Sequence, residues 1–130
     1  MIGAYSGYAA EFLIGLSALT FFLFTIPLML VPLKWAKIMG FEIPAHTDLA
    51  VYFGRSVAAL AASVNFLAMR AGLSGRAVFD VLILIVAIAC FMTIIHVWGA
   101  IKKIQPLSET LEIGFWIAMG LVALAVLPPI

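Results

Sequence analysis

Three polar residues stand out in an otherwise apolar chain, because each belongs to a different hydrophobic run: Arg55, His96 and Glu112. The hydrophobic runs are connected by short polar segments, which we call joints. At a helical rise of about 1.5 Å per residue, the three residues lie about 10, 9 and 6 Å along the helix from the nearest joint. Polar groups at such positions in membrane helices usually face a partner or a cavity. We expect a layer formed by a guanidinium, an imidazole and a carboxylate, which is our candidate ligand site.

The same residues also have a simpler structural explanation. Arg55 and Glu112 are the natural ion pair of this layer. Alternatively, Arg55 extends to the lipid headgroups, and Glu112 stays at the surface beside a helix N-terminus, where a carboxylate is favoured. Both interpretations remain open from the sequence.

His96 alone is weak evidence for a metal or a haem, since one imidazole supplies one axial position. We predict no metal site and no cofactor. The alternative is a quinone held by the layer, or a haem or another pigment bound through His96. A macrocycle at His96 would use Gly99 one turn later, because glycine lets a flat ring approach the backbone.

The composition places these residues in a membrane protein. Hydrophobic residues make up 66% of the 130 residues and charged residues 10%, against about 45 to 50% and about 25% in soluble domains. Four runs, at about 12–31, 49–69, 81–101 and 111–130, have the length of about 20 residues that crosses a bilayer as a helix. The alternating pattern of barrel strands is missing. We therefore predict an all-α, polytopic membrane protein, a single domain over 1–130 with four transmembrane helices in an antiparallel bundle.

The joints between the runs indicate the orientation of the chain. The first joint, 32–47, is the longest and has room for a short interfacial helix. Lysines gather at the end of the bundle that contains this joint, whereas arginines mark the opposite end. These residues are Lys34, Lys37, Lys102 and Lys103 on one side, and Arg70 and Arg76 on the other. Since positive charge favours the cytoplasmic side, we expect both termini to be non-cytoplasmic, in the inner (plasma) membrane of a bacterium.

Other residues are interpreted as structural. Asn65 lies deep in the second run, and we expect it to hydrogen-bond between helices. Glu11 precedes the first run and either pairs with Arg70 or Arg76 or is exposed. Pro27 is expected to kink the first helix.

Small residues at spacings of four favour close helix packing in membranes. Gly54, Ala58 and Ala62 form such a stripe on the second run, and Gly114 with Ala118 form another on the fourth. We expect the second and fourth helices to approach each other closely at these stripes.

The sequence informs on function mainly through the kinds of function that it excludes. A net charge of +1 offers no basic surface for nucleic acid. The chain contains no HExxH, GxSxG or phosphate-loop motif, and its short joints cannot build an active site outside the membrane. We expect no enzyme activity, and instead an accessory or structural subunit of a larger membrane complex, or a homo-oligomer. Its partners would be membrane lipids and other membrane subunits or itself. The alternative is a redox-linked protein that binds a quinone, lipid or pigment at Arg55, His96 and Glu112.

The sequence also resembles a known family, and this resemblance too favours an accessory role. Phe53, Gly54 and Arg55 open the second run, and His96 and Gly99 lie near the end of the third. This pattern resembles the DoxX-like group of small four-helix membrane proteins, over the whole chain in length and helix count. One branch of that group includes a subunit of a thiosulfate:quinone oxidoreductase, so the resemblance implies a quinone-linked accessory role and no catalytic residue.

Overall fold

The computed structural model describes residues 2–129, and within that range it contains helices and no strands. Four helical segments are long and apolar enough to cross a membrane. They are Ser6–Leu30, Asp48–Ser74 (α4), Val78–Lys102 (α5) and Leu107–Ala125 (α6). The predicted all-α class is confirmed, and four helices have a length and composition that could span a membrane, as the sequence predicted.

The first of these segments is composite. It consists of a 3₁₀ turn, η1 (Ser6–Tyr8), then α1 (Ala9–Thr20), a π-helical stretch, η2 (Phe21–Thr25), and α2 (Ile26–Leu30). Val31 ends α2 with a non-helical backbone, and Pro32 opens a short helix, α3 (Pro32–Ile38), inside the first joint. The sequence predicted this region as one run over 12–31 followed by a joint with room for a short helix.

Pro27 explains why the first segment changes its helical form. A proline has no N–H to donate, and its ring clashes with the carbonyl four residues earlier, which here is that of Leu23. The π-helical stretch absorbs this conflict, and the Ile26 N–H bonds to Phe21 five residues back. The Leu23 carbonyl instead accepts a hydrogen bond from the Trp35 indole N–H of α3 at 3.4 Å.

The other helices differ from the predicted runs mainly at their ends. α4 continues to Ser74 because no breaker occurs before Gly75, whose φ of 67° closes the helix in the left-handed conformation. α6 begins at Leu107 rather than 111, directly after Pro106. It ends at Ala125 rather than 130, ahead of Pro128 and Pro129, whose rings oppose continuation of the helix. Residue 130 lies outside the described range.

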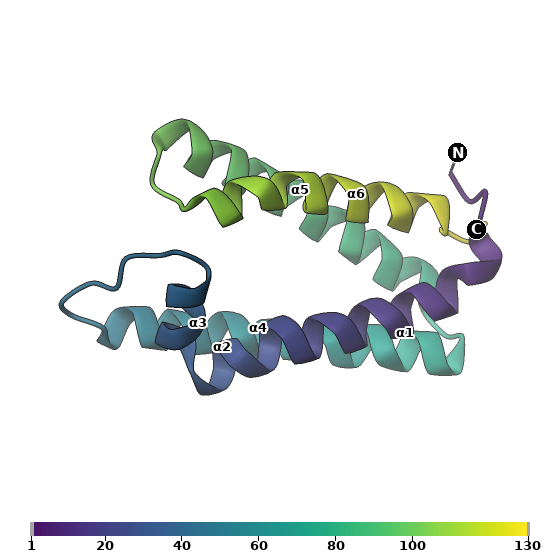
Figure 1. The fold of residues 1–130 in the computed structure, drawn as a ribbon. Helices are drawn as coiled ribbons and strands as arrows, with labels where there is room; N and C mark the ends of the chain where they lie inside the picture. Colours follow the sequence, from purple (N-terminus) through teal and green to yellow (C-terminus); the bar gives the residue numbers. More distant parts are fainter. Residues whose placement is uncertain (1, 130) are drawn as a thin grey trace.

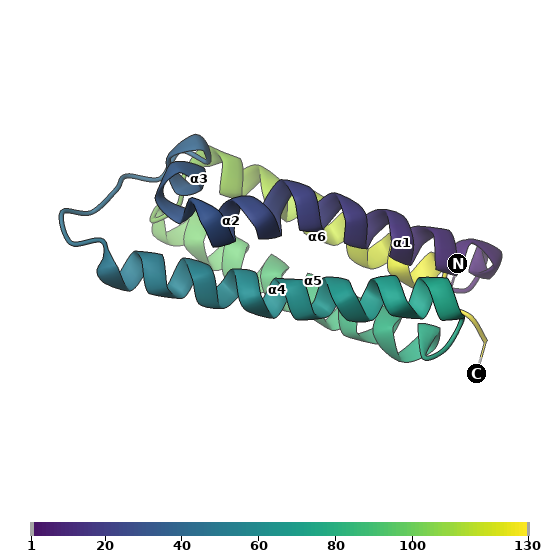
Figure 2. The ribbon, with the colours of Figure 1, turned by 90° about the horizontal axis from the view of Figure 1, so that it is seen from below.

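The helices form two antiparallel pairs. α1 lies along α4, and α5 lies along α6, as both views show (Figure 1, Figure 2). The first pair is close-packed near Gly72, where an added Cβ would lie 2.7 Å from Ile14 Cγ1 and 2.9 Å from the Ala10 carbonyl oxygen. Glycine is therefore required at this crossing.

The predicted approach of the second and fourth helices is wrong. Gly54 of α4 faces α3 and α2 instead, since its Cβ would lie 3.1 Å from Pro32 Cβ and 3.5 Å from Leu28 Cδ1. Gly114 of α6 has open space at its Cβ position. Small residues indicated that α4 packs closely against a neighbour, but they did not identify the neighbour.

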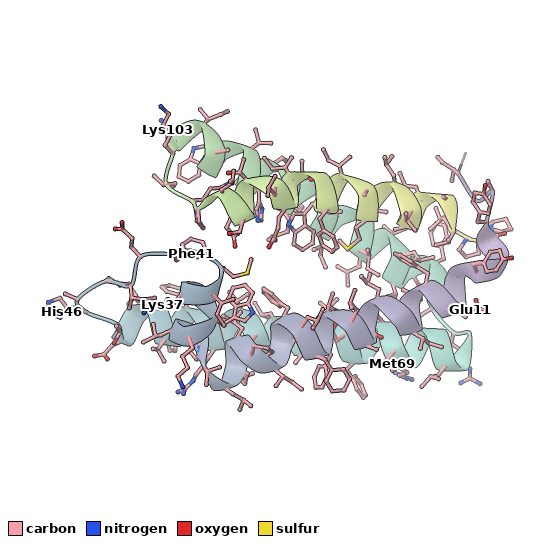
Figure 3. All side chains as sticks on the ribbon, in the orientation of Figure 1. Glu11, Lys37, Phe41, His46, Met69 and Lys103 are labelled. Atoms are coloured by element: carbon pink, nitrogen blue, oxygen red, sulfur yellow. The ribbon has the colours of Figure 1, made fainter. Side chains whose placement is uncertain are left out.

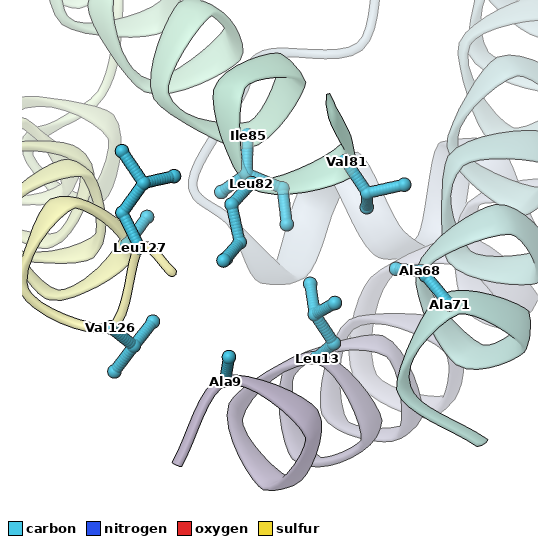
Figure 4. Close-up of a cluster of buried hydrophobic side chains, with 10 residues drawn as sticks. Ala9, Leu13, Ala68, Ala71, Val81, Leu82, Ile85, Val126 and Leu127 are labelled. Atoms are coloured by element: carbon cyan, nitrogen blue, oxygen red, sulfur yellow. The ribbon is translucent and has the colours of Figure 1, made fainter. Parts of the chain in front are cut away.

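The two pairs meet in an apolar core at the end of the molecule that holds both termini (Figure 1, Figure 4). Leu13 of α1 and Leu82 of α5 are fully buried there, beside Ala68 of α4. The N-terminal segment reinforces this end, because the N–H groups of Gly3 and Tyr5 bond to the last carbonyls of α6, at 3.0 and 2.8 Å.

A polar contact joins the pairs at their other end. The Ser108 hydroxyl, in the first turn of α6, donates to the Met39 carbonyl just after α3. Gly40, with a φ of 89°, passes close to Pro106, whose Cβ would lie 3.2 Å from a Cβ on the glycine. Lys37, His46 and Lys103 are at this end, and Glu11 is at the opposite one (Figure 3).

Candidate functional site

The structure brings together two of the three residues of the predicted layer. His96, near the C-terminal end of α5, is 3% exposed. Its Nε2 atom lies 3.7 Å from Oε2 of Glu112 on α6. A third residue, Glu109, lies closer still, with Oε2 at 3.1 Å from His96 Nε2. One ligand atom from each of these three residues fits within 4.8 Å of the others, and we call this group the His–Glu–Glu cluster.

The antiparallel packing of α5 and α6 creates this cluster. His96 lies in the second-last turn of α5, and a four-residue connection returns the chain into α6. Glu109 and Glu112 are three residues apart on α6, so they share one face of the helix. The imidazole is therefore flanked by two carboxylates from the neighbouring helix.

The other ring nitrogen of His96 fixes the tautomer. Nδ1 lies 2.7 Å from the carbonyl oxygen of Met92, one turn earlier on α5. Because a carbonyl oxygen only accepts hydrogen bonds, Nδ1 must carry a proton. Nε2, which faces the carboxylates, is then either a bare lone pair or the second proton-bearing nitrogen of an imidazolium.

Gln105 supports the cluster from the connection between the helices. Its amide nitrogen donates to the His96 carbonyl at 3.0 Å and to Thr110 Oγ1 at 3.1 Å, which ties α5 to α6. The side chain occupies the space over Gly99, where an added Cβ would lie 2.9 Å from Gln105 Cδ. Gly99 thus accommodates a glutamine, and this side chain fills the surface beside His96 that the alternative, a bound macrocycle, would use.

An aromatic ring covers the cluster on the third turn of α6. The Trp116 ring centroid lies 6.0 Å from that of His96, with the two planes inclined at 46°. Its indole N–H faces Glu112 but is buried without a hydrogen bond of normal geometry. Among the buried side-chain nitrogen and oxygen atoms of residues 2–129, the Trp116 indole nitrogen is the one without a hydrogen-bond partner.

Arg55 does not join the cluster. It is exposed on α4, on the other helix pair, and no carboxylate of the described residues lies within ion-pair distance of it. The Arg55–Glu112 ion pair that the sequence allowed is therefore not formed. Arg55 instead borders a shallow hollow along one face of α4, lined by Asp48, Val51, Tyr52, Ser56 and Ala59.

The predicted structural role of Asn65 agrees with its contacts. Its side-chain oxygen accepts a hydrogen bond from Thr20 Oγ1 at 2.6 Å, and its amide nitrogen donates to Thr25 Oγ1 at 2.9 Å. Asn65 thus joins α4 to both ends of the irregular region of the first segment. Glu11 is exposed and forms no ion pair with the arginines of the described chain.

Sequence reasoning missed Glu109 and Gln105. We took Glu109 only as a residue at the start of the fourth helix, because the run was placed from 111. The available signal was the spacing of Glu109, Glu112 and Trp116, at three and four residues, which puts them on one helical face. Nothing in the sequence pattern connected Gln105 with Gly99.

In chemical terms the cluster is a set of electron-pair donors. Two carboxylates and an imidazole nitrogen converge, and no Arg or Lys of the described residues lies within ion-pair distance of either carboxylate. Such a set binds a proton, a cation or a hydroxyl donor, and it repels an anion. Comparison of the chain with protein-family models, with curated proteins and with solved structures finds no match.

Proposed function

We propose that the chain is a non-catalytic integral membrane protein that works as a subunit, packed against other membrane proteins or against further copies of itself. Four helices of suitable length and composition support the membrane location. The observation that supports the subunit role is Arg55, a charged residue within α4 that is exposed and forms no ion pair with the described residues.

The α4 surface around Arg55 has the character of a helix contact. A charge within a transmembrane helix almost always faces a bundle interior or a water-filled cavity. Ser56 and Ala59, close to Arg55 in the same hollow, are small residues of the kind that let a second helix approach. A partner that offers a carboxylate or carbonyl oxygens would satisfy the guanidinium there. Within one copy, Arg55 has only lipid headgroups or water to reach.

The mass of the purified protein tests this role. We expect the full chain, of 14.0 kDa, to elute from size-exclusion chromatography with light scattering in mild detergent as a larger assembly. Arg55→Gln should release monomer, because it removes the charge and keeps much of the side-chain length. Arg70→Gln, which changes an exposed arginine near the other end of α4, should leave the assembly intact. A wild-type monomer without a co-purifying protein would contradict the proposal.

The orientation is part of the same proposal. The lysine end, with Lys37 and Lys103 (Figure 3), faces the cytoplasm, and both termini face the other side. A relation to the DoxX-like proteins also remains a proposal, supported by chain length and the number of spans. It would fit an accessory subunit.

The His–Glu–Glu cluster supports a second candidate function, which is binding of a small ligand or ion. Without Arg55 nearby, a lipid phosphate has no cation to bind there. A quinol hydroxyl or a cation fits the carboxylates and imidazole better. An absorption spectrum and an organic extract of the purified protein test for quinone or pigment, and an extract that contains only ordinary lipids would count against these ligands.

A further inference from the structure

The His–Glu–Glu cluster needs a positive charge that the surrounding chain does not supply. Nδ1 of His96 donates to Met92, so a neutral imidazole directs the lone pair of Nε2 at two carboxylates. Lone pairs and anionic oxygens at 3.1 and 3.7 Å repel one another. No Lys or Arg of residues 2–129 lies within 4.0 Å of these carboxylates. Something positive must therefore occupy the centre, either a proton on the imidazole or on a carboxylate, or a metal ion.

We propose that the cluster binds a divalent first-row transition-metal ion, of the Zn²⁺ or Mn²⁺ type, through His96 Nε2 and the carboxylates of Glu109 and Glu112. This inference deepens the second candidate function, on which it rests, and departs from our sequence-based expectation of no metal site. One imidazole with carboxylate oxygens is a donor set that these ions accept, whereas Mg²⁺ and Ca²⁺ prefer oxygen ligands alone.

Charge balance favours a divalent ion over a single proton. Two carboxylates and a proton leave one net negative charge in a helix pair that is apolar over most of its length, and an unbalanced charge in such surroundings is costly. Two carboxylates and a divalent ion are neutral. A proton on Nε2 also bonds well to Glu109 alone, because the distance to Glu112 is 3.7 Å, beyond hydrogen-bond length.

The distances suit a shared ion. Ligand atoms bound to Zn²⁺ at about 2.1 Å in tetrahedral directions lie about 3.4 Å apart. The two separations from His96 Nε2, 3.1 and 3.7 Å, lie on either side of that value. The remaining separation, within 4.8 Å, closes by a small rotation of a glutamate side chain. Three protein ligands leave a further coordination position for water.

The surroundings of His96 resemble the outer support of metal-binding histidines. Such a histidine almost always donates its second ring N–H to a carbonyl or carboxylate, which fixes its tautomer and orientation. Met92 accepts this bond here, and Gln105 holds the His96 backbone carbonyl. Trp116 contributes the unpartnered indole N–H beside Glu112, a donor suited to the outer oxygen of a ligating carboxylate.

Co²⁺ uptake tests the proposal, because this ion replaces Zn²⁺ in such sites and has visible absorption bands that report its ligands. The full-length protein in detergent is stripped with a chelator and titrated with Co²⁺. We expect saturation at one ion per chain, with bands of mixed nitrogen and oxygen coordination, and competition by Zn²⁺. Metal analysis of protein purified without chelator should show a bound transition metal.

Two variants with matched chemistry locate the site. Glu112→Gln keeps the shape of the side chain and removes one ligand charge, and it should weaken Co²⁺ binding by more than about tenfold, the smallest loss typical even of outer-shell changes. Glu42→Gln makes the same change at an exposed glutamate on the same side of the molecule and should have no effect. If Glu112→Gln fails to fold by circular dichroism, His96→Gln serves as the second test.

Wild-type protein that folds and takes up no Co²⁺ overturns the inference and leaves protons alone to balance the charge of the cluster. Uptake that survives both Glu112→Gln and His96→Gln overturns it as well, since the ion then binds elsewhere. Failure here is separable from failure of the subunit role. An oligomer without metal contradicts only the metal site, and a metal-binding monomer contradicts only the subunit proposal.

Discussion

Gly72 gives the sharpest test of the packing between α1 and α4. An alanine there would put its Cβ 2.7 Å from Ile14 Cγ1, whereas carbon atoms at optimal contact lie about 3.5 to 4.0 Å apart. The same Cβ would lie 2.9 Å from the Ala10 carbonyl oxygen, which is backbone and cannot rotate away. The helices must therefore separate by about 1 Å at this crossing for Gly72→Ala to be accommodated.

The expected magnitude is a difference between two opposing effects. Overpacking a well-fitted contact costs about 1 to 3 kcal/mol, and alanine is favoured over glycine inside a helix by about 1 kcal/mol. We expect Gly72→Ala to lower the free energy of unfolding by up to about 2 kcal/mol. Gly114→Ala is the matched control, because its Cβ meets open space in the middle of α6. It should raise the same free energy by up to about 1 kcal/mol.

Unfolding of both variants in mixed micelles, followed by circular dichroism, measures the two free energies. The decisive quantity is the difference between the free energies of unfolding of the two variants, which should be about 1 to 3 kcal/mol. If Gly72→Ala is as stable as Gly114→Ala or more stable, the close crossing of α1 and α4 is refuted. A further check is Ile14→Ala combined with Gly72→Ala, which should rescue only part of the loss, since the Ala10 carbonyl remains in place.

Two further predictions concern the polar contacts within each helix pair. Asn65→Ala should lower the free energy of unfolding by about 1 kcal/mol, because its two hydrogen bonds to threonines are lost. Ser63→Ala, at an exposed position of the same helix, should change this free energy little. Equal effects of the two substitutions would argue against the buried network. Gly99→Ala should displace the Gln105 side chain and speed amide hydrogen exchange in residues 103–107. Gly15→Ala, where the Cβ has open space, should leave that exchange unchanged. If exchange in residues 103–107 stays as slow in Gly99→Ala as in the wild type, the position of Gln105 does not depend on the glycine.

The sequence predicted the features that depend on the length of the apolar runs and on the depth of a residue along its helix. Apolar runs of about 20 residues have the length of a membrane-spanning helix, and the structure has a helix long and apolar enough to span a membrane at each of the four runs. Asn65, which we expected to bond between helices, hydrogen-bonds to Thr20 and Thr25 of the first segment. The same counting along each helix put His96 and Glu112 at similar depth, and they lie close together.

Arg55 shows what depth alone does not determine. Residues in one layer meet only if the helices are neighbours and the side chains face each other. The pairing of α4 with α1, and of α5 with α6, places Arg55 and Glu112 in different pairs. That pairing depends on packing details such as the Gly72 crossing, which small-residue stripes do not reveal, because alanine and glycine are common on many faces of membrane helices.

Glu109 was missed for a local reason. Because the fourth run was placed from 111, Glu109 was considered only as a residue at the start of that helix, where a carboxylate needs no partner. The helix begins at Leu107, so Glu109 is in the first turn, and the favourable helix N-terminus offsets part of the cost of its charge. A prediction that began the helix directly after Pro106 would have put both glutamates on one face.

The two polar centres differ in the groups that they need, and this difference supports the proposed roles. Asn65 and its threonines are neutral, and their donors and acceptors pair with each other, so this centre needs no further group. The His–Glu–Glu cluster brings two carboxylates to one imidazole and leaves an indole N–H beside it without a partner. Unbalanced charge among apolar helices is retained only where something compensates it. We therefore expect ligand binding at the α5–α6 pair, and the proposed contact with a partner at the exposed Arg55 surface on α4.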